Sequence, residues 1–217
     1  MSLKKPWIIL LLFVLVSSCE SSKTMYVHTM SKSDVPYDME WHQFLENSKD
    51  QLKSLWLTNF GGDVEFYVSA GTNLRSVEAI RQSEVIPVET YRMSYQSFAG
   101  FNAQTSFSDA LTLSKEDALL QIVNNGKYIG YVRLKYAQNR WRLPSIRLCQ
   151  IKTSQFSDVV LKRKLQMSNV LLTERSEYEM HFNVYVDEKG ELMNISMYGT
   201  IRPFREVLMD YQKGIIR

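Results

Sequence analysis

Histidine and cysteine are scarce in this chain of 217 residues, which has three histidines and two cysteines. A zinc site needs three or four converging ligands, drawn from these residues and carboxylates. No histidine has another histidine or a cysteine within five residues. His42 could share a helix face with Glu40 and Glu46, but such a row is more typical of a solvent-facing surface. We therefore predict no metal site.

Glycine is also sparse, and its nine residues are scattered in the manner of turn positions. The chain has no glycine run that could cradle a phosphate. It has no Gly-x-Ser-x-Gly, and Ser-x-x-Lys occurs only at residues 2–5. Glu177, Glu179 and His181 share one strand face and are the set most open to acid–base chemistry. Alternating strands produce such rows routinely, so we predict no catalytic residue, no cofactor and, more generally, no enzyme.

Neither sign of charge is in excess. The chain has 26 basic and 23 acidic residues, a formal charge of +3, and removal of Lys4 and Lys5 would leave +1. A balance so close to neutral does not indicate nucleic acid as a partner. Aromatic residues make up 12% of the chain, which suits an ordinary globular core.

The main apolar run lies at the N-terminus. Lys4 and Lys5 precede an apolar stretch over residues 7–16, and two serines then lead to Cys19. This order is typical of a secretory signal. The fourteen uncharged residues from Pro6 to Cys19 would reach about 21 Å as a helix, whereas a hydrocarbon core is about 30 Å thick. Cleavage is therefore favoured over a membrane-spanning anchor.

The four residues Val16, Ser17, Ser18 and Cys19 resemble the lipobox of bacterial lipoprotein precursors. Leucine is commoner than valine at the first position. The resemblance covers only residues 1–20. It implies a signal peptide at 1–18, a diacylglyceryl group on the Cys19 thiol, and a further acyl chain such as palmitate on the new N-terminus. Several chains anchor a protein stably, whereas one does so only marginally. The alternative is an ordinary secretory signal with a chance cysteine.

The lipobox resemblance predicts a cell-envelope location, on the inner or the outer membrane and facing the periplasm or the cell surface. The residues that follow are polar and rich in serine and threonine, and they predict a flexible tether over 19–37. Residues 38–217 form the expected globular domain, with a sub-boundary near 108–114. The remaining thiol, Cys149, is interpreted as a buried apolar residue rather than a nucleophile.

Hydrophobic periodicity predicts an α+β domain. Helices are expected from residue 38 to about 60, over 74–82, 114–125 and 155–166, and from Pro203 onward. Strands are expected over 63–71, 85–95, 127–137, 140–151 and 177–186, with a return strand from Glu191. Pro87 suggests an edge position for the start of its strand. The stretch 100–109 predicts a loop or irregular strand.

The second half thus reads as helix–strand–strand repeated, with antiparallel sheets covered by helices. This order is similar to the tandem helix–two-strand units of PepSY-like and β-lactamase-inhibitor-like proteins, and to cystatin-like and NTF2-like folds. No residue motif supports the similarity, which concerns the fold alone.

A cationic cluster is expected on the hairpin formed by strands 127–137 and 140–151. Its members are Arg133, Lys135, Arg140 and Arg142, with Tyr131 among them. If the strand register brings these side chains together, they could contact lipid phosphates, an acidic glycan or an acidic protein. Alternatively, they only keep a sheet edge soluble.

The sequence therefore predicts a membrane-anchored, non-catalytic binding or assembly module. Its expected partners are the membrane, through the lipid, and an envelope protein or an acidic or glycan ligand. One alternative is an inhibitor or accessory protein of a secreted enzyme. Another is an enzyme with an unrecognised site near His181.

Overall fold

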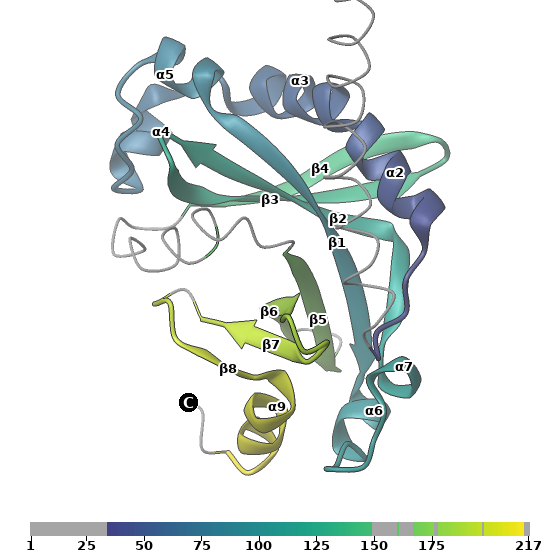
Figure 1. The fold of residues 1–217 in the computed structure, drawn as a ribbon. Coiled ribbons are helices and arrows are strands. Elements are labelled where there is room, and N and C mark those ends of the chain that lie inside the picture. The colour runs from purple at the N-terminus through teal and green to yellow at the C-terminus, as the bar shows by residue number, and fades with distance from the viewer. Residues whose placement is uncertain (1–33, 149–159, 161–166, 176–177, 197, 215–217) are drawn as a thin grey trace, which may run out of the picture.

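Eight strands form one sheet in the residues that the computed structural model describes, which are 34–148, 160, 167–175, 178–196 and 198–214. The strand order is β4-β3-β2-β1-β5-β6-β7-β8. All neighbouring strands run antiparallel except β1 and β5, which are parallel. The architecture is α+β, with helices packed against a mostly antiparallel open sheet (Figure 1).

The strands are β1 (Glu84–Ser94), β2 (Thr112–Asn124), β3 (Lys127–Ala137), β4 (Arg140–Leu148), β5 (Ser168–Arg175), β6 (Tyr178–Val186), β7 (Leu192–Ile195) and β8 (Ile201–Pro203). The helices are α2 (Met39–Asn47), α3 (Lys49–Phe60), α4 (Val64–Ser69), α5 (Val77–Gln82), α6 (Tyr95–Ala99), α7 (Phe107–Ala110) and α9 (Phe204–Gln212).

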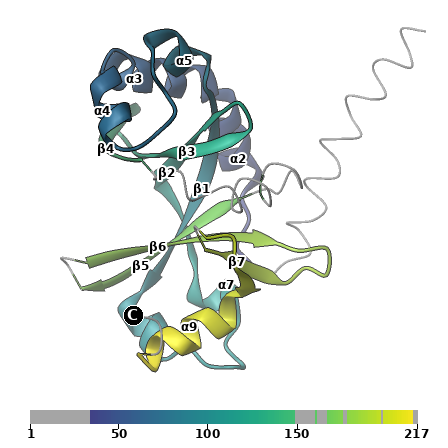
Figure 2. The ribbon, with the colours of Figure 1, turned by 90° about the vertical axis from the view of Figure 1, so that its left-hand side faces the viewer.

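The sheet consists of two meanders, β1–β4 and β5–β8, joined by the parallel β1–β5 pair. Figure 2 shows the two halves diverging, with α2–α5 over the first and α6, α7 and α9 over the second. We call the helix-covered side of the sheet the outer face. Its buried side chains form one cluster around Trp56 and Leu120 and another around Phe204 and Val170. The Trp56 indole N–H donates to the Tyr67 hydroxyl at 2.9 Å inside the first cluster.

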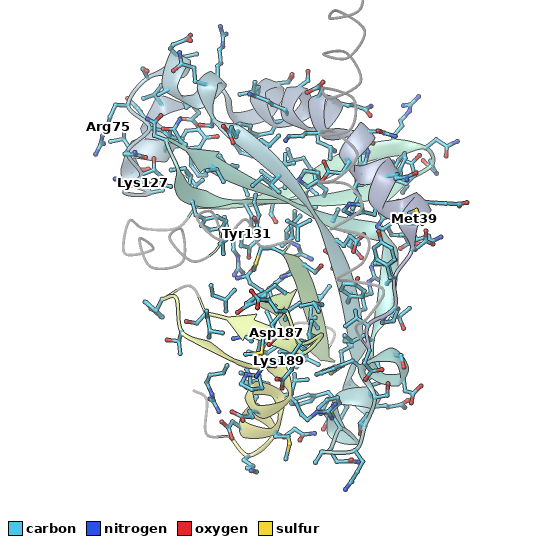
Figure 3. All side chains as sticks on the ribbon, viewed as in Figure 1. Met39, Arg75, Lys127, Tyr131, Asp187 and Lys189 are labelled. Atoms are coloured by element: carbon cyan, nitrogen blue, oxygen red, sulfur yellow. The ribbon has the colours of Figure 1, made fainter. Side chains whose placement is uncertain are left out.

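The opposite side, which we call the inner face, is concave. Tyr131 on β3 and His181 on β6 lie on this face, and their ring centroids are 6.1 Å apart. Three strands separate β3 from β6, so in a flat sheet the two strands would lie about 19 Å apart. The sheet must therefore bend strongly around its inner face. Figure 3 shows Tyr131 beneath β3, on the side of the second meander.

The helix expected over 114–125 is wrong, because residues 114–124 belong to β2. The Ser114–Asp117 stretch does form the hydrogen bonds of a helix cap: Ser114 Oγ accepts from the Asp117 N–H at 3.0 Å. Here those bonds close a bulge, since Glu89 pairs with Ala118 while Tyr91 pairs with Leu113. The following six residues, 118–123, are all buried, as in a central strand with both faces covered. The first unit that was expected to be helix–strand–strand therefore consists of three strands, β2, β3 and β4.

The strand expected over 63–71 is also wrong, because α4 occupies this stretch. Asp63 caps the helix by accepting from the Phe66 N–H at 3.0 Å. The apolar side chains therefore follow helical spacing and direct Tyr67 into the core. Strand β5 was not expected at all. The helix expected over 155–166 lies outside the described residues, apart from Val160, which is helical.

Several other expectations are confirmed. Strand β3 has the expected bounds, and β1, β4, β6 and α9 begin within two residues of theirs. The expected helix over 38–60 forms, with a break at Ser48.

Strand β1 is central rather than at an edge, but its pairing with β5 starts only at Glu89. Pro87, which has no N–H to donate, thus precedes that pairing. The stretch expected to be irregular contains α7, and β2, which begins at Thr112 within the expected sub-boundary 108–114, pairs with β1 before it.

The domain includes residues that were expected in the tether. Val35 is 7% exposed and packs in the second outer-face cluster. Asp34 accepts a hydrogen bond from the Phe107 N–H at 2.8 Å and another from the Ser106 hydroxyl, at the start of α7. Burial opposes ionisation, but hydrogen bonds from Ser106, Phe107 and Ser108 outweigh it and hold the pKa of Asp34 below its ordinary value. The chain thus enters the domain at a fixed point.

Replacing Asp34 with alanine is expected to lower the free energy of unfolding by about 1 kcal/mol at pH 7, because the first N–H of α7 loses its acceptor. A depressed pKa stabilises the fold above the unfolded pKa, so this difference should disappear as the pH falls below 3.8. Urea denaturation at several pH values measures it. Gln104→Ala, at an exposed position of the adjoining loop, serves as the control. An equal loss in both variants would contradict the role of Asp34.

Candidate functional site

The expected cationic cluster lies on one face of the β3–β4 hairpin. The β3–β4 register places Lys135 directly opposite Arg142, and Ala137 opposite Arg140. Side chains that lie opposite each other, or two apart along a strand, share one face of a sheet. We call the resulting set, all on the inner face, the basic patch: Arg133, Lys135, Arg140, Arg142 and Arg147. Sequence reasoning did not include Arg147, which the register places opposite Tyr131.

The hairpin forms because its local sequence supports it. Gln138 and Asn139 adopt positive φ angles of 53° and 56°, the conformation of a tight two-residue hairpin turn. Along β4, exposed arginines alternate with side chains such as Trp141, which is 8% exposed and faces α2. The apolar side chains of the hairpin therefore pack against the helices on the outer face, whereas its basic side chains lie on the inner face.

Four members of the basic patch, Lys135, Arg140, Arg142 and Arg147, are exposed. In the part of the chain that the structure describes, no carboxylate lies within ion-pair distance of these four side chains. Like charges directly opposite each other destabilise a strand pair. The pairing of Lys135 with Arg142 therefore does not contribute to the stability of the fold. An anion bound between them would remove the repulsion.

The carboxylate that lies opposite the basic patch on β2 already forms an ion pair with another residue. Asp117 pairs with Lys135 across β2 and β3, but its Oδ2 binds the Arg92 guanidinium and accepts from Ser114 Oγ at 2.9 Å. Asp117 is 6% exposed. Asp117 therefore offsets the positive charge of Arg92 and leaves that of the basic patch unbalanced.

A polar group lies deeper on the inner face. Asn169 is fully buried, and its amide donates to the Phe182 carbonyl at 3.1 Å, so its Oδ1 is free to accept. The Nδ1 of His181 lies 3.0 Å from that oxygen and is therefore the protonated nitrogen. Asn169 thus fixes the orientation of the imidazole. Glu177 and the Glu179 side chain, expected beside His181, lie outside the described residues.

A second histidine forms a buried ion pair that sequence reasoning missed. His42 was interpreted as part of a solvent-facing row, but its Nδ1 lies 3.3 Å from Oε1 of Glu89. Glu89 is 3% exposed, and its Oε2 accepts from the Tyr91 hydroxyl at 3.1 Å. The Glu89 carboxylate raises the pKa of His42, although burial opposes this, and burial together with Glu89 raises the pKa of Tyr91. The sequence signal that could have indicated this pair is Glu89, a single carboxylate among the apolar residues on the outer face of β1.

The pair joins α2 to the sheet. His42 projects from α2, while Glu89 and Tyr91 project from β1. Tyr37, just before α2, lies against the His42 ring with centroids 6.2 Å apart. We interpret this group as structural, because its carboxylate is enclosed and the inner face carries the exposed charge.

The described residues hold no group of three or more His, Cys, Asp or Glu side chains arranged to bind a metal ion. Nor do they include a helix with the length and apolar character needed to cross a membrane. Cys19 and Cys149 lie outside the described residues. Comparison with protein-family models, with curated proteins and with solved structures finds no match for this chain.

Proposed function

We propose that this protein is a lipid-anchored protein of a bacterial cell envelope, and that its domain is a non-catalytic module that binds an acidic partner through the basic patch. The observation that carries the binding function is the register of β3 and β4. It places Lys135 opposite Arg142 with no carboxylate at ion-pair distance among the described residues. Guanidinium groups bind carboxylate and phosphate oxygens in bidentate geometry, so an acidic ligand suits this face.

The anchor is proposed from residues 1–19. Their order of basic pair, apolar run, small residues and Cys19 resembles a lipobox, and lipidation there would hold the domain at the inner or the outer membrane. The similarity to PepSY-like, cystatin-like or NTF2-like folds stays a prediction, which the binding function does not require.

Crosslinking in intact cells with recovery and mass spectrometry tests the proposal. Wild type is compared with Cys19→Ala and with Arg140→Glu/Arg142→Glu. We expect an acylated N-terminal peptide that begins at Cys19, and crosslinks to an acidic partner that both variants lose. An N-terminal peptide without acyl mass in the wild type would refute the anchor. Crosslinks that survive in the Arg140→Glu/Arg142→Glu variant would refute the basic patch as the binding surface.

A further inference from the structure

Helix α2 connects the point where the chain enters the domain to the hairpin that carries the basic patch. Helix α2 follows the entry point at Asp34, and its aromatic side chains pack on the end of the β3–β4 hairpin. Phe44 lies 5.1 Å from Tyr136 and 5.9 Å from Trp141 between ring centroids. Tyr136 and Trp141 face each other across the hairpin, next to the Ala137–Arg140 pair. Figure 1 shows the closed end of this hairpin beside α2.

The length of the chain before Asp34 keeps the domain within reach of any membrane that holds Cys19. Asp34 follows Cys19 by fifteen positions along the chain. Fully extended they reach at most about 50 Å, and as a flexible coil they would span about 20 Å. An anchored domain is thus held at a high effective concentration relative to the bilayer surface, so even a weak second contact becomes populated.

The chemistry of the hairpin end suits lipid phosphates. Residues 137–140 are all exposed, and Arg140, Arg142 and Lys135 follow one another on the inner face. Each basic side chain close to an anionic membrane strengthens binding about fivefold, and the attraction extends about one Debye length, which is about 10 Å at 0.1 M salt. Met39 at the start of α2 is 48% exposed and adds an apolar side chain at this end of the molecule (Figure 3).

We infer that the acidic partner of the basic patch is the anionic phospholipid surface of the membrane that holds the anchor. The inference rests on the proposed lipid anchor and identifies the ligand of the proposed binding surface. The exposed end of the β3–β4 hairpin contacts the lipid phosphates, while the acyl chains on Cys19 hold the chain in the same bilayer. Two attachments fix the orientation of the domain, which a tether alone would leave free to rotate.

Energy transfer in vesicles tests this contact. The full acylated chain is reconstituted into vesicles of phosphatidylcholine alone or with 30 mol% phosphatidylglycerol. A donor dye is placed on Ala137→Cys in a Cys149→Ser background, and the acceptor is a headgroup-labelled lipid. We expect higher transfer in the anionic vesicles, and a loss of that gain in 1 M salt, where the Debye length is about 3 Å.

The Arg140→Glu/Arg142→Glu variant is expected to weaken docking by about 30-fold or more, since two attractive charges of about fivefold each are lost. Arg75→Glu/Arg81→Glu makes the same change in net charge at exposed positions of the α5 region, away from α2 (Figure 3), and should keep the gain. Melting temperatures verify that each variant folds. Arg140→Gln/Arg142→Gln replaces the reversal pair if that pair does not fold.

The possible results separate this inference from the proposed function. Equal transfer in both vesicle types, from a chain whose N-terminal peptide carries acyl mass, overturns the lipid contact and leaves the anchor intact. Equal loss in the control pair also overturns the contact. Crosslinks in cells from the hairpin to an acidic protein, with no dependence on phosphatidylglycerol, reassign the patch to a protein partner. A chain without acyl mass refutes the anchor, and the inference fails with it.

Discussion

Replacing Gly130 with alanine is expected to lower the free energy of unfolding by about 3 kcal/mol and to separate β4 from β3. Gly130 pairs with Leu148 on the edge strand. A Cβ at this position would lie 2.3 Å from the Arg147 carbonyl oxygen and 2.9 Å from the Leu148 Cα, so the β4 backbone would have to move. The φ angle of 158° is also one that L side chains rarely adopt.

Urea denaturation measures the loss of stability, and hydrogen exchange of the β4 amides locates it. Gly62→Ala is the matched control, because a Cβ there meets nothing within 4 Å. That change should stay within about 0.5 kcal/mol of wild type. Because β4 carries Arg140, Arg142 and Arg147, Gly130→Ala should also reduce vesicle contact. Stability equal to that of Gly62→Ala would show that β4 does not pack on β3 as described.

Below pH 6.5, removing His42 is expected to cost about 2–3 kcal/mol, because it leaves the buried Glu89 carboxylate without its cationic neighbour. The Tyr91 hydroxyl would remain as a hydrogen-bond donor. His42→Ala/Glu89→Gln should lose less than the two single changes together, since the double variant has no buried charge to satisfy. Gln43→Ala, at an exposed position of the same helix, should be nearly neutral.

The effect of His42 should depend on pH with a defined sign. Glu89 raises the pKa of His42 above its ordinary value of 6.5. A raised pKa stabilises the fold fully below the unfolded pKa, and the stabilisation is lost as the pH rises through the folded pKa.

The difference in unfolding free energy between wild type and His42→Ala should therefore be largest below pH 6.5 and shrink above it. Three neighbouring groups have pKa values that move away from this window: Asp38, which pairs with Lys115, has a lowered pKa, and Tyr37 and Tyr91 have raised ones. Urea denaturation from pH 5.5 to 8.5 measures the trend. A difference that grows with pH would contradict the ion pair.

Elements that depend on short-range signals could be predicted from the sequence. The β3–β4 hairpin follows from alternating strands around a two-residue turn, and the basic patch follows from the hairpin. The β6 alternation and the Pro203 start of α9 are equally local. By contrast, the chemistry of Ser114–Asp117 is the same in a helix cap and in a bulge. Only the buried run after it, which becomes the centre of a sheet, distinguishes the two.

Features that depend on distant partners could not be predicted. Strand β5 pairs in parallel with β1, and nothing near residues 168–175 signals that partner. His42 and Glu89 meet because α2 packs across β1, which periodicity along either element does not show. The VEFYV stretch of α4 favours a strand by composition. Its capping aspartate and its contact with Trp56 decide the outcome instead.

The parallel β1–β5 pair has a consequence for how the chain acquires its structure. Glu89 and its partner Ser168 are about 80 positions apart, so this pairing closes late, whereas the β1–β4 meander is built from local contacts. During synthesis from the N-terminus, the first meander can form while one side of β1 still lacks a neighbour. Such an open strand is a template for pairing with other chains. The folding intermediate, rather than the finished protein, is therefore the species most exposed to pairing with other chains.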